Sequence, residues 1–264
     1  MKIIIPFSGG VNSTYSLYRW LSETDADVLA YHSIDRWESE EANVEEFKRL
    51  EKVKDFLQQI RDFDFQTSEW PSKYVEQRIP IRPGFTNGTY DIGILRPRYD
   101  GYAKWCVESN ADAISIGLSL ENTAMDCGYN TLRSVVEQNN ADIYLGGMPD
   151  LTPVAKGDDF DWDYISSKMI GRFEQFEFLP KELRYMTIKC RMNNLPSCVD
   201  TKCRDCAYQR TYEKFVDEGK TGRDFDLYCA KQGSYGPWRH EADPETYLYR
   251  GRGKDGKLPY LLYE

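Results

Sequence analysis

Short apolar runs alternate with longer stretches of helical periodicity over the first 145 residues. Apolar runs of four to eight residues are typical of buried strands, and apolar residues every three or four positions are typical of helices with one buried face. We therefore predict strands at 3–7, 27–34, 63–67, 113–116 and 143–145. We predict helices at 13–21, 40–60, 99–110 and 130–139, of which 40–60 has the clearest periodicity.

This alternation predicts an α/β fold, a doubly wound parallel sheet with helices on both faces. Segment 69–97 is broken by several prolines and glycines, so we expect a long irregular loop there. After residue 160 the alternation stops, and helices are predicted at 165–176 and 181–187. We divide the chain into an α/β domain at 1–158, a helical metal-binding region at 159–216 and a loop-rich extension at 217–264.

A Gly/Ser loop joins the first predicted strand to the first predicted helix. A glycine pair allows a tight turn and close approach of the backbone to a ligand, and a helix N-terminus directs N–H groups at an anion. The loop is neither a Walker loop nor a G-x-G-x-x-G turn. We predict that it binds a phosphate chain through Phe7, Ser8, Gly9, Gly10, Val11, Asn12, Ser13 and Thr14.

Two further residues fall just past predicted strand ends, Asp35 and Gly117. Ligands of open parallel sheets bind beyond the carboxyl ends of the strands. Asp35 is therefore a candidate for a ribose or metal contact, with a helix cap as the alternative. Gly117 is either a point of close nucleotide approach or a turn glycine.

Four of the seven cysteines lie between residues 190 and 206, with the spacing C-x7-C-x4-C-x2-C. The C-x2-C pair is typical of tetrahedral zinc, and the whole chain has only two histidines. We therefore predict a structural zinc site with four thiolates, with an iron–sulfur cluster or free buried thiols as the alternatives. Its ligands would be Cys190, Cys198, Cys203 and Cys206.

The composition narrows the class of protein. The chain has 264 residues and 41% apolar residues, enough for a sizeable core. Its net charge of −9 argues against broad adhesion to nucleic acid or to an anionic membrane. The first residues lead directly into a core strand, and no apolar run is long enough to cross a membrane, so we expect a cytoplasmic protein.

The loop resembles the S-G-G-x-D-S pyrophosphate loop of the N-type ATP pyrophosphatases, with Asn12 where that family usually has Asp. Together with the cysteine cluster, Arg210, Phe215 and the run Ala111 to Gly117, it resembles the 7-cyano-7-deazaguanine synthase family. The likeness covers about residues 1–216. It departs from the family in the longer spacing before Cys203 and in the sequence around Asp126.

The resemblance implies an adenine nucleotide alpha hydrolase-like fold that uses ATP, Mg²⁺ and Zn²⁺, in a homodimer. The implied reaction joins a carboxylated 7-deazaguanine to ammonia through an acyl adenylate and releases AMP and pyrophosphate. A second ATP then dehydrates the resulting amide to the nitrile. Ser8, Asn12, Ser13 and Lys104 would be catalytic, and Arg96, Arg98 and Asp126 would bind the substrate.

Two alternatives stay open. The chain could be a non-catalytic nucleotide-binding protein on the same fold, which the amide at Asn12 favours. It could also be an ATP-dependent tRNA thiolation enzyme using Cys106 and Cys127, which the acidic charge disfavours. Pyrophosphate release in the absence of RNA separates the proposed reaction from thiolation.

Overall fold

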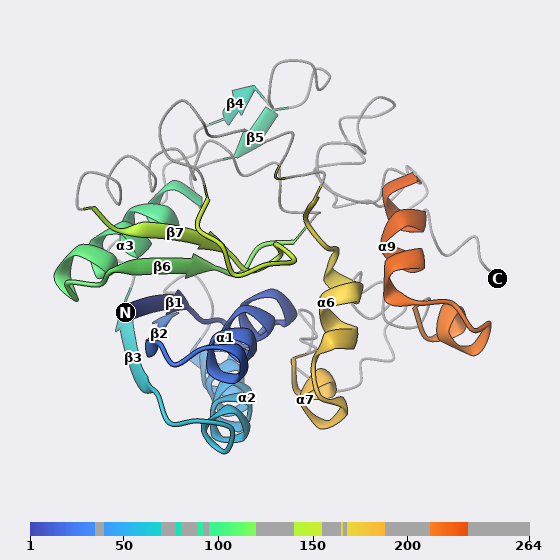
Figure 1. The fold of residues 1–264 in the computed structure, drawn as a ribbon, viewed down its shortest axis with the longest axis horizontal. Coiled ribbons are helices and arrows are strands. Elements are labelled where there is room, and N and C mark those ends of the chain that lie inside the picture. Colours follow the sequence, from blue (N-terminus) through green and yellow to red (C-terminus); the bar gives the residue numbers. More distant parts are fainter. Residues whose placement is uncertain are drawn as a thin grey trace.

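A computed structural model describes residues 1–34, 40–69, 78–80, 89–91, 95–119, 140–154, 165, 168–187 and 212–231 (Figure 1). Five strands form one sheet in the order β3-β2-β1-β6-β7, and every neighbouring pair is parallel. The strands are β1 (Lys2–Pro6), β2 (Asp27–Ile34), β3 (Asp64–Glu69), β6 (Ala113–Ile116) and β7 (Asp142–Leu145). The parallel α/β sheet predicted from the sequence is confirmed.

The central strand β1 is buried on both faces, which explains its continuous apolar run. Ile3 and Ile5 enter one apolar core, whereas Ile4 enters the other, because successive side chains of a strand point to opposite faces. The sheet therefore separates two cores, and each is closed by helices.

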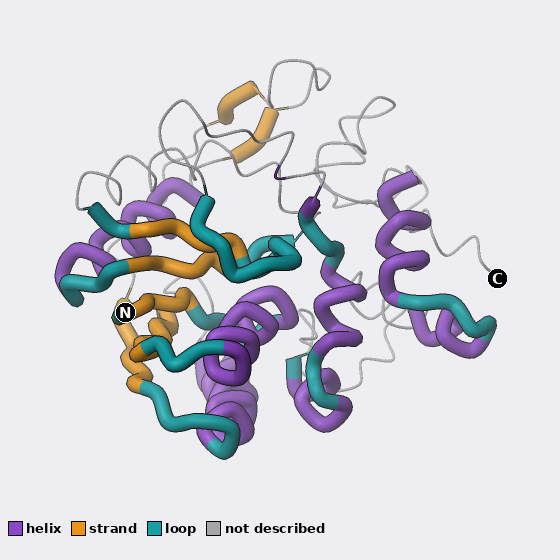
Figure 2. The backbone as a smooth tube through the Cα atoms, in the orientation of Figure 1, coloured by secondary structure: helices purple, strands orange, loops and turns teal. Residues whose placement is uncertain are grey.

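Helices cover both faces of the sheet, as Figure 2 shows. On one face, α1 (Val11–Glu23) and α2 (Glu40–Gln58) add buried side chains such as Trp20 and Leu57 to the core that contains Ile3. On the other face, α3 (Leu95–Glu108) adds Trp105 and Cys106 to the core that contains Ile4. This arrangement is that of a doubly wound sheet.

The order of the strands reverses between β1 and β6. The chain leaves β1 for α1 on one face, and it reaches β6 from α3 on the other face. The carboxyl ends of β1 and β6 are therefore neighbours at the topological switch point, where open α/β sheets bind ligands. The Gly/Ser loop begins at this point.

A second group of helices lies beside α1. Figure 1 shows α6 (Arg172–Phe178) between α1 and α9 (Gly222–Lys231), with α7 (Lys181–Met186) at the end of α6. Aromatic rings hold this group together, since Phe173 packs edge-to-face on Phe225 with ring centroids 4.7 Å apart. Phe225 is fully buried.

The carboxyl end of α1 is fixed by an arginine from the turn after α2. Arg61 donates hydrogen bonds to the backbone oxygens of Trp20 and Ala26, each at 2.9 Å, and to that of Thr24. The last turn of α1 has no basic residue of its own. Arg61 therefore supplies the positive charge that favours a helix C-terminus.

Several element predictions need correction. The helix predicted at 165–176 is interrupted: Ile165 and Lys168 are helical, residues 169–171 are not, and α6 begins at Arg172 after the extended backbone of Gly171. Helix α3 begins at Leu95 rather than at 99, and the predicted irregular loop contains a short antiparallel pair, β4 (Arg78–Pro80) with β5 (Thr89–Asp91). The predicted loop-rich extension contains α9. The helix predicted at 130–139 lies outside the described residues.

The proposed division of the chain into three regions stays a prediction. Within the described segments, no helix has the length and apolar character that a membrane crossing requires.

Candidate nucleoside phosphate site

The Gly/Ser loop turns sharply at Gly9. This residue has a φ of +66°, a conformation that favours glycine, and a Cβ added there would lie 3.0 Å from Leu50 Cδ1. Gly10 is the N-cap of α1, and the first backbone hydrogen bond of the helix runs from Thr14 N–H to Gly10 O at 2.9 Å. The chain thus changes from strand to helix within four residues after β1.

Two hydroxyl groups gather inside this turn. Ser8 Oγ and Ser13 Oγ are 3.1 Å apart, and the Ser8 N–H donates to Ser13 Oγ at 3.2 Å. Ser13 Oγ also donates to Gly10 O at 3.2 Å. Ser8 is exposed to solvent, whereas Ser13 is buried beneath it, so of the two residues Ser8 lies at the open side of the loop.

The first turn of α1 provides backbone donors. Its amides precede the first intrahelical hydrogen bond, and a helix N-terminus carries a partial positive charge. No acidic residue stands in this turn to oppose a bound anion. Phe7, Val11 and Thr14 have side chains buried in the protein. The N–H groups of Phe7 and Thr14 already donate to Tyr31 O at 2.6 Å and to Gly10 O at 2.9 Å, so these two residues have no backbone donor left for a phosphate.

The loop after β6 packs directly against this turn. A Cβ on Gly117 would lie 2.6 Å from Ser13 Cα and 2.7 Å from Asn12 O, which is closer than two such atoms can approach. Glycine is therefore required here by the contact between α1 and β6. A nucleotide contact of Gly117 stays a prediction.

Asn12 connects the same two elements through its side chain. Its Nδ2 donates to Ser119 Oγ at 2.8 Å, and Ser119 is fully buried. One turn further along α1, Ser16 Oγ and Ser115 Oγ lie 2.9 Å apart in the core. Hydrogen bonds and close packing together hold the N-terminus of α1 at the carboxyl end of β6.

Arg49 from α2 reaches the other side of the loop. Its Nη1 donates to Gly9 O at 2.5 Å, and its Nη2 donates to Ser8 O at 2.9 Å. Arg49 and Ser119 were not among the predicted site residues, although Arg49 stands next to the apolar Leu50 of its helix and Ser119 closely follows a predicted strand. Neither signal shows which backbone or side chain the residue contacts.

The remaining predicted site residues fall into two groups. Some belong to α3, and the others lie outside the described residues. Lys104 is exposed on α3, and its Nζ lies 3.6 Å from the Glu108 carboxylate in the same helix. Arg96 and Arg98 belong to the first turns of α3, but the structure does not describe their side chains. Asp35, Asp126 and the four predicted zinc ligands (Cys190, Cys198, Cys203, Cys206) lie outside the described residues. Among the residues it does describe, no three His, Cys, Asp or Glu side chains form a metal site.

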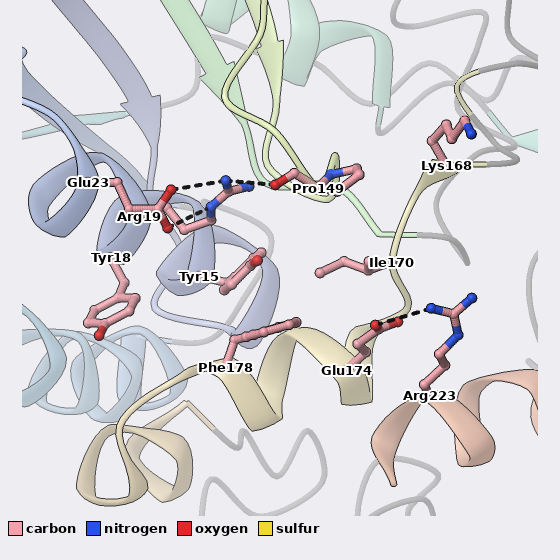
Figure 3. A pocket seen from close by; sticks show the side chains of 10 residues that line it. All are labelled: Tyr15, Tyr18, Arg19, Glu23, Pro149, Lys168, Ile170, Glu174, Phe178 and Arg223. Atoms are coloured by element: carbon pink, nitrogen blue, oxygen red, sulfur yellow. Dashed lines mark hydrogen bonds and ion pairs between the residues drawn. The ribbon is translucent and has the colours of Figure 1, made fainter.

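A cleft of about 600 Å³ lies between α1, α6 and the start of α9, as Figure 3 shows. Arg19 at its edge donates Nε and Nη2 to the two Glu23 carboxylate oxygens, each at 3.0 Å. It also donates to the backbone oxygens of Met148 and Pro149. This guanidinium is thus committed to contacts within the protein.

The cleft is also lined by a second ion pair, between α9 and α6, and by an aromatic pair that joins α1 to α6. Arg223 lies 3.9 Å from Glu174, and the rings of Tyr15 and Phe178 stack with centroids 5.9 Å apart. Burial raises the pKa of the Glu174 carboxyl, and burial also raises the pKa of Tyr15, against the lowering effect of Arg19. Because these charges are paired, the Gly/Ser loop is the better candidate for binding a phosphate.

Comparisons with known proteins give fold similarity alone. No protein-family model and no curated protein matches the chain. A universal stress protein family member from Burkholderia pseudomallei shares 9% identity over 55% of this chain and 93% of that chain, with a TM-score of 0.33. The U34-tRNA thiolase NcsA from Methanococcus maripaludis, solved with its 4Fe–4S cluster, shares 13% identity over 80% of each chain, with a TM-score of 0.36. Similarity at this level assigns no activity to the chain.

Proposed function

We propose that this chain is an ATP-dependent enzyme that holds the triphosphate of ATP on the Ser8–Ser13 loop. The observation that carries the proposal is the arrangement at the switch point: the turn at Gly9, the first turn of α1 and the paired hydroxyls of Ser8 and Ser13. Several hydrogen-bond donors converge at this helix N-terminus, and a triphosphate carries enough negative oxygens to accept from all of them.

The residues of the loop suit cleavage of ATP to AMP and pyrophosphate. The backbone amides of the first turn of α1, with the hydroxyls of Ser8 and Ser13, would stabilise the negative charge that develops on departing pyrophosphate. Asn12 is fixed by Ser119, so its amide has a defined position beside these donors. Mg²⁺ would enter with ATP and neutralise part of the phosphate charge.

The substrate proposal rests on the sequence resemblance rather than on the geometry. We propose that a carboxylated 7-deazaguanine receives AMP from one ATP, with release of pyrophosphate, and that ammonia then displaces AMP to give the amide. A second ATP activates the amide oxygen, which leaves as the amide is dehydrated to the nitrile. Asp126, Arg96 and Arg98 are the proposed substrate contacts, and Lys104 is proposed as a further catalytic cation. A structural zinc ion on the four cysteines completes the proposal.

The test is a turnover assay with the purified full-length chain. Mg-ATP and ammonium are supplied with 7-carboxy-7-deazaguanine, with tRNA, or with neither, and AMP, pyrophosphate and product mass are measured. We expect AMP and a nitrile only with the deazaguanine. AMP formation that needs tRNA would favour thiolation, and ATP binding with no turnover would favour the non-catalytic alternative.

Ser13→Ala is the loop variant for this assay. It removes the hydroxyl that accepts from Ser8 N–H and donates to Gly10 O. We expect turnover to fall by at least about tenfold, as for other losses of a preorganised donor. Ser22→Ala near the other end of α1 is the matched control, since Ser22 Oγ donates to Tyr18 O in its own helix. Equal activity of the two variants would contradict the proposed role of the loop.

A further inference from the structure

We infer that Arg49 is a positioning residue that aims two backbone N–H groups of the loop at the bound phosphates. This inference rests on the proposed binding of ATP and adds a residue outside the loop motif to that site. Arg49 belongs to α2, 36 residues after the end of the Ser8–Ser13 loop.

The contacts of Arg49 join three parts of the chain. Its two Nη atoms donate to Gly9 O at 2.5 Å and to Ser8 O at 2.9 Å. Nη1 also lies 3.4 Å from Met186 O at the end of α7. The planar guanidinium can bind successive carbonyls in fixed directions, which a lysine ammonium cannot do.

The orientation of the peptide units follows from these contacts. In a planar trans peptide the N–H points opposite to the C=O of the same unit. Because Arg49 binds the oxygens of Ser8 and Gly9, the N–H groups of Gly9 and Gly10 point away from it. Gly10 N–H lies 3.4 Å from Ser8 Oγ, so it faces the exposed hydroxyl side of the loop.

Arg49 also affects the strength of these donors. A cation that binds a carbonyl oxygen polarises the peptide unit, which makes its N–H a stronger donor. The two polarised amides add to those of the first turn of α1. Arg49 lies on the side of the loop opposite these N–H groups. It would therefore strengthen phosphate binding without contacting the phosphates.

Arg61 offers a matched control for a purely structural role. It too donates to backbone oxygens, those of Trp20, Thr24 and Ala26, but at the opposite end of α1. Replacing either arginine removes hydrogen bonds that brace α1 or its loop. Only the loss of Arg49 changes the N–H groups that face the proposed phosphates.

The experiment compares Arg49→Ala, Arg49→Lys and Arg61→Ala in the full-length chain. Dissociation constants for ATP, inorganic pyrophosphate and adenosine are measured by calorimetry, and unfolding is followed separately. For Arg49→Ala we expect about tenfold or greater weakening for ATP and pyrophosphate, with adenosine affinity unchanged. Arg49→Lys should be intermediate, and added guanidinium should restore part of the loss in Arg49→Ala. Arg61→Ala should lower stability and leave all three affinities unchanged.

The outcomes separate the inference from the proposed function. If the unmodified chain binds neither ATP nor pyrophosphate, the proposed function is wrong, and the inference falls with it. If it binds both and Arg49→Ala binds them equally well, the inference alone is wrong. Equal weakening for adenosine and pyrophosphate would show a collapsed site and would also overturn it. Should Arg49→Ala fail to fold, Arg49→Lys decides, because unchanged pyrophosphate affinity in that variant contradicts a role for the planar fork.

Discussion

Asn12 is held by a hydrogen bond whose direction depends on its being an amide. Nδ2 donates to Ser119 Oγ at 2.8 Å. An aspartate at this position could only accept, so the Ser119 hydroxyl would have to reverse and donate to it. Both arrangements keep one hydrogen bond between α1 and the loop after β6. The difference between the two residues is therefore mainly one of charge.

Asn12→Asp should keep the fold but weaken phosphate binding when no divalent cation is present. Two unit charges 4 Å apart interact by about 4 kcal/mol at the effective dielectric near a protein surface, so we expect at least about a tenfold loss of affinity. Mg²⁺ should reverse most of the loss. Calorimetry with pyrophosphate, with and without Mg²⁺, measures both effects.

Asn140→Asp controls for the added charge, because Asn140 is exposed in the turn before β7. Its pyrophosphate affinity should be unchanged. If Asn12→Asp also leaves the Mg²⁺-free affinity unchanged, position 12 does not face the phosphates.

Cys106 should be an unreactive thiol in the folded chain. It is buried, and burial raises its pKa to about 11. At neutral pH it then has roughly a few hundred times less thiolate than an exposed cysteine with a pKa near 8.5. We expect slow alkylation by iodoacetamide in the native protein and fast alkylation in urea, measured on the Cys106 peptide by mass spectrometry. Rapid native alkylation would contradict this and would return Cys106 to consideration as a thiolation cysteine.

At the scale of elements, the close contact between α1 and the end of β6 makes the stability of the protein depend on Gly117. A Cβ at Gly117 would meet backbone atoms of Asn12 and Ser13 at 2.6 and 2.7 Å, which cannot rotate away. Gly117→Ala should therefore destabilise the protein by about 1–3 kcal/mol, the usual cost of overpacking. It should also reduce ATP affinity by displacing the first turn of α1. Urea unfolding and calorimetry measure the two effects.

Gly10→Ala is the matched control for this variant. A Cβ there would lie 3.5 Å from Ser8 Oγ, an ordinary contact, and Gly10 has a negative φ of −81°. The substitution costs less than about 1 kcal/mol, since alanine is only a poorer N-cap than glycine. Equal destabilisation by the two substitutions would show that the contact at Gly117 is relieved by movement of α1.

The docking of α9 on α6 depends on one buried carboxylate. Asp226 accepts hydrogen bonds from Phe173 N–H at 3.1 Å and from Glu174 N–H at 2.8 Å, at the N-terminus of α6. Asp226→Asn removes the charge and one acceptor. We expect a loss of about 1.5–3 kcal/mol in the free energy of unfolding, typical of hydrogen bonds to a charged group. Asp217→Asn, at an exposed position, should change it little. Equal stability of the two variants would show that Asp226 does not anchor α6.

The sequence was sufficient for elements whose pattern is local. The predicted bounds of the strands at 27–34 and 113–116 match β2 and β6, because each run is rich in apolar residues and is followed directly by Asp35 or Gly117 in the sequence. The interruption before α6 was missed because the N–H groups of Phe173 and Glu174 at the start of α6 bind Asp226, which comes from a distant helix. Helix α9 had a local signal, a capping box in which Thr221 N–H and hydroxyl donate to Asp224, but its weak periodicity hid it.

The candidate site likewise contains residues that the local sequence predicts and residues that only tertiary contacts place there. The turn at Gly9 and the hydroxyl pair follow from six consecutive residues, Ser8 to Ser13, so they could be predicted. Arg49 and Ser119 enter through tertiary contacts, which no spacing along the chain defines.

For the whole molecule, metal content is the most direct test of the cysteine proposal. If the four cysteines form a closed thiolate site, the purified chain should contain about one zinc per molecule, and no visible absorbance of an iron–sulfur cluster. Elemental analysis and an absorption spectrum measure this. Cys203→Ser should lose the metal, whereas Cys106→Ser should retain it. Iron with labile sulfide would instead support the iron–sulfur alternative.

The loop at Gly9 is synthesised before all of the residues from α2, the loop after β6 and α7 that hold it. Its carbonyls are bound by Arg49, its first helical turn is seated on Gly117 and Ser119, and Arg49 also contacts Met186. A nascent chain that ends before these residues contains the sequence Ser8 to Ser13, but it lacks the contacts that fix the shape of the loop. During synthesis, the proposed ATP site should therefore be complete only after α7 has emerged from the ribosome, later than the loop itself.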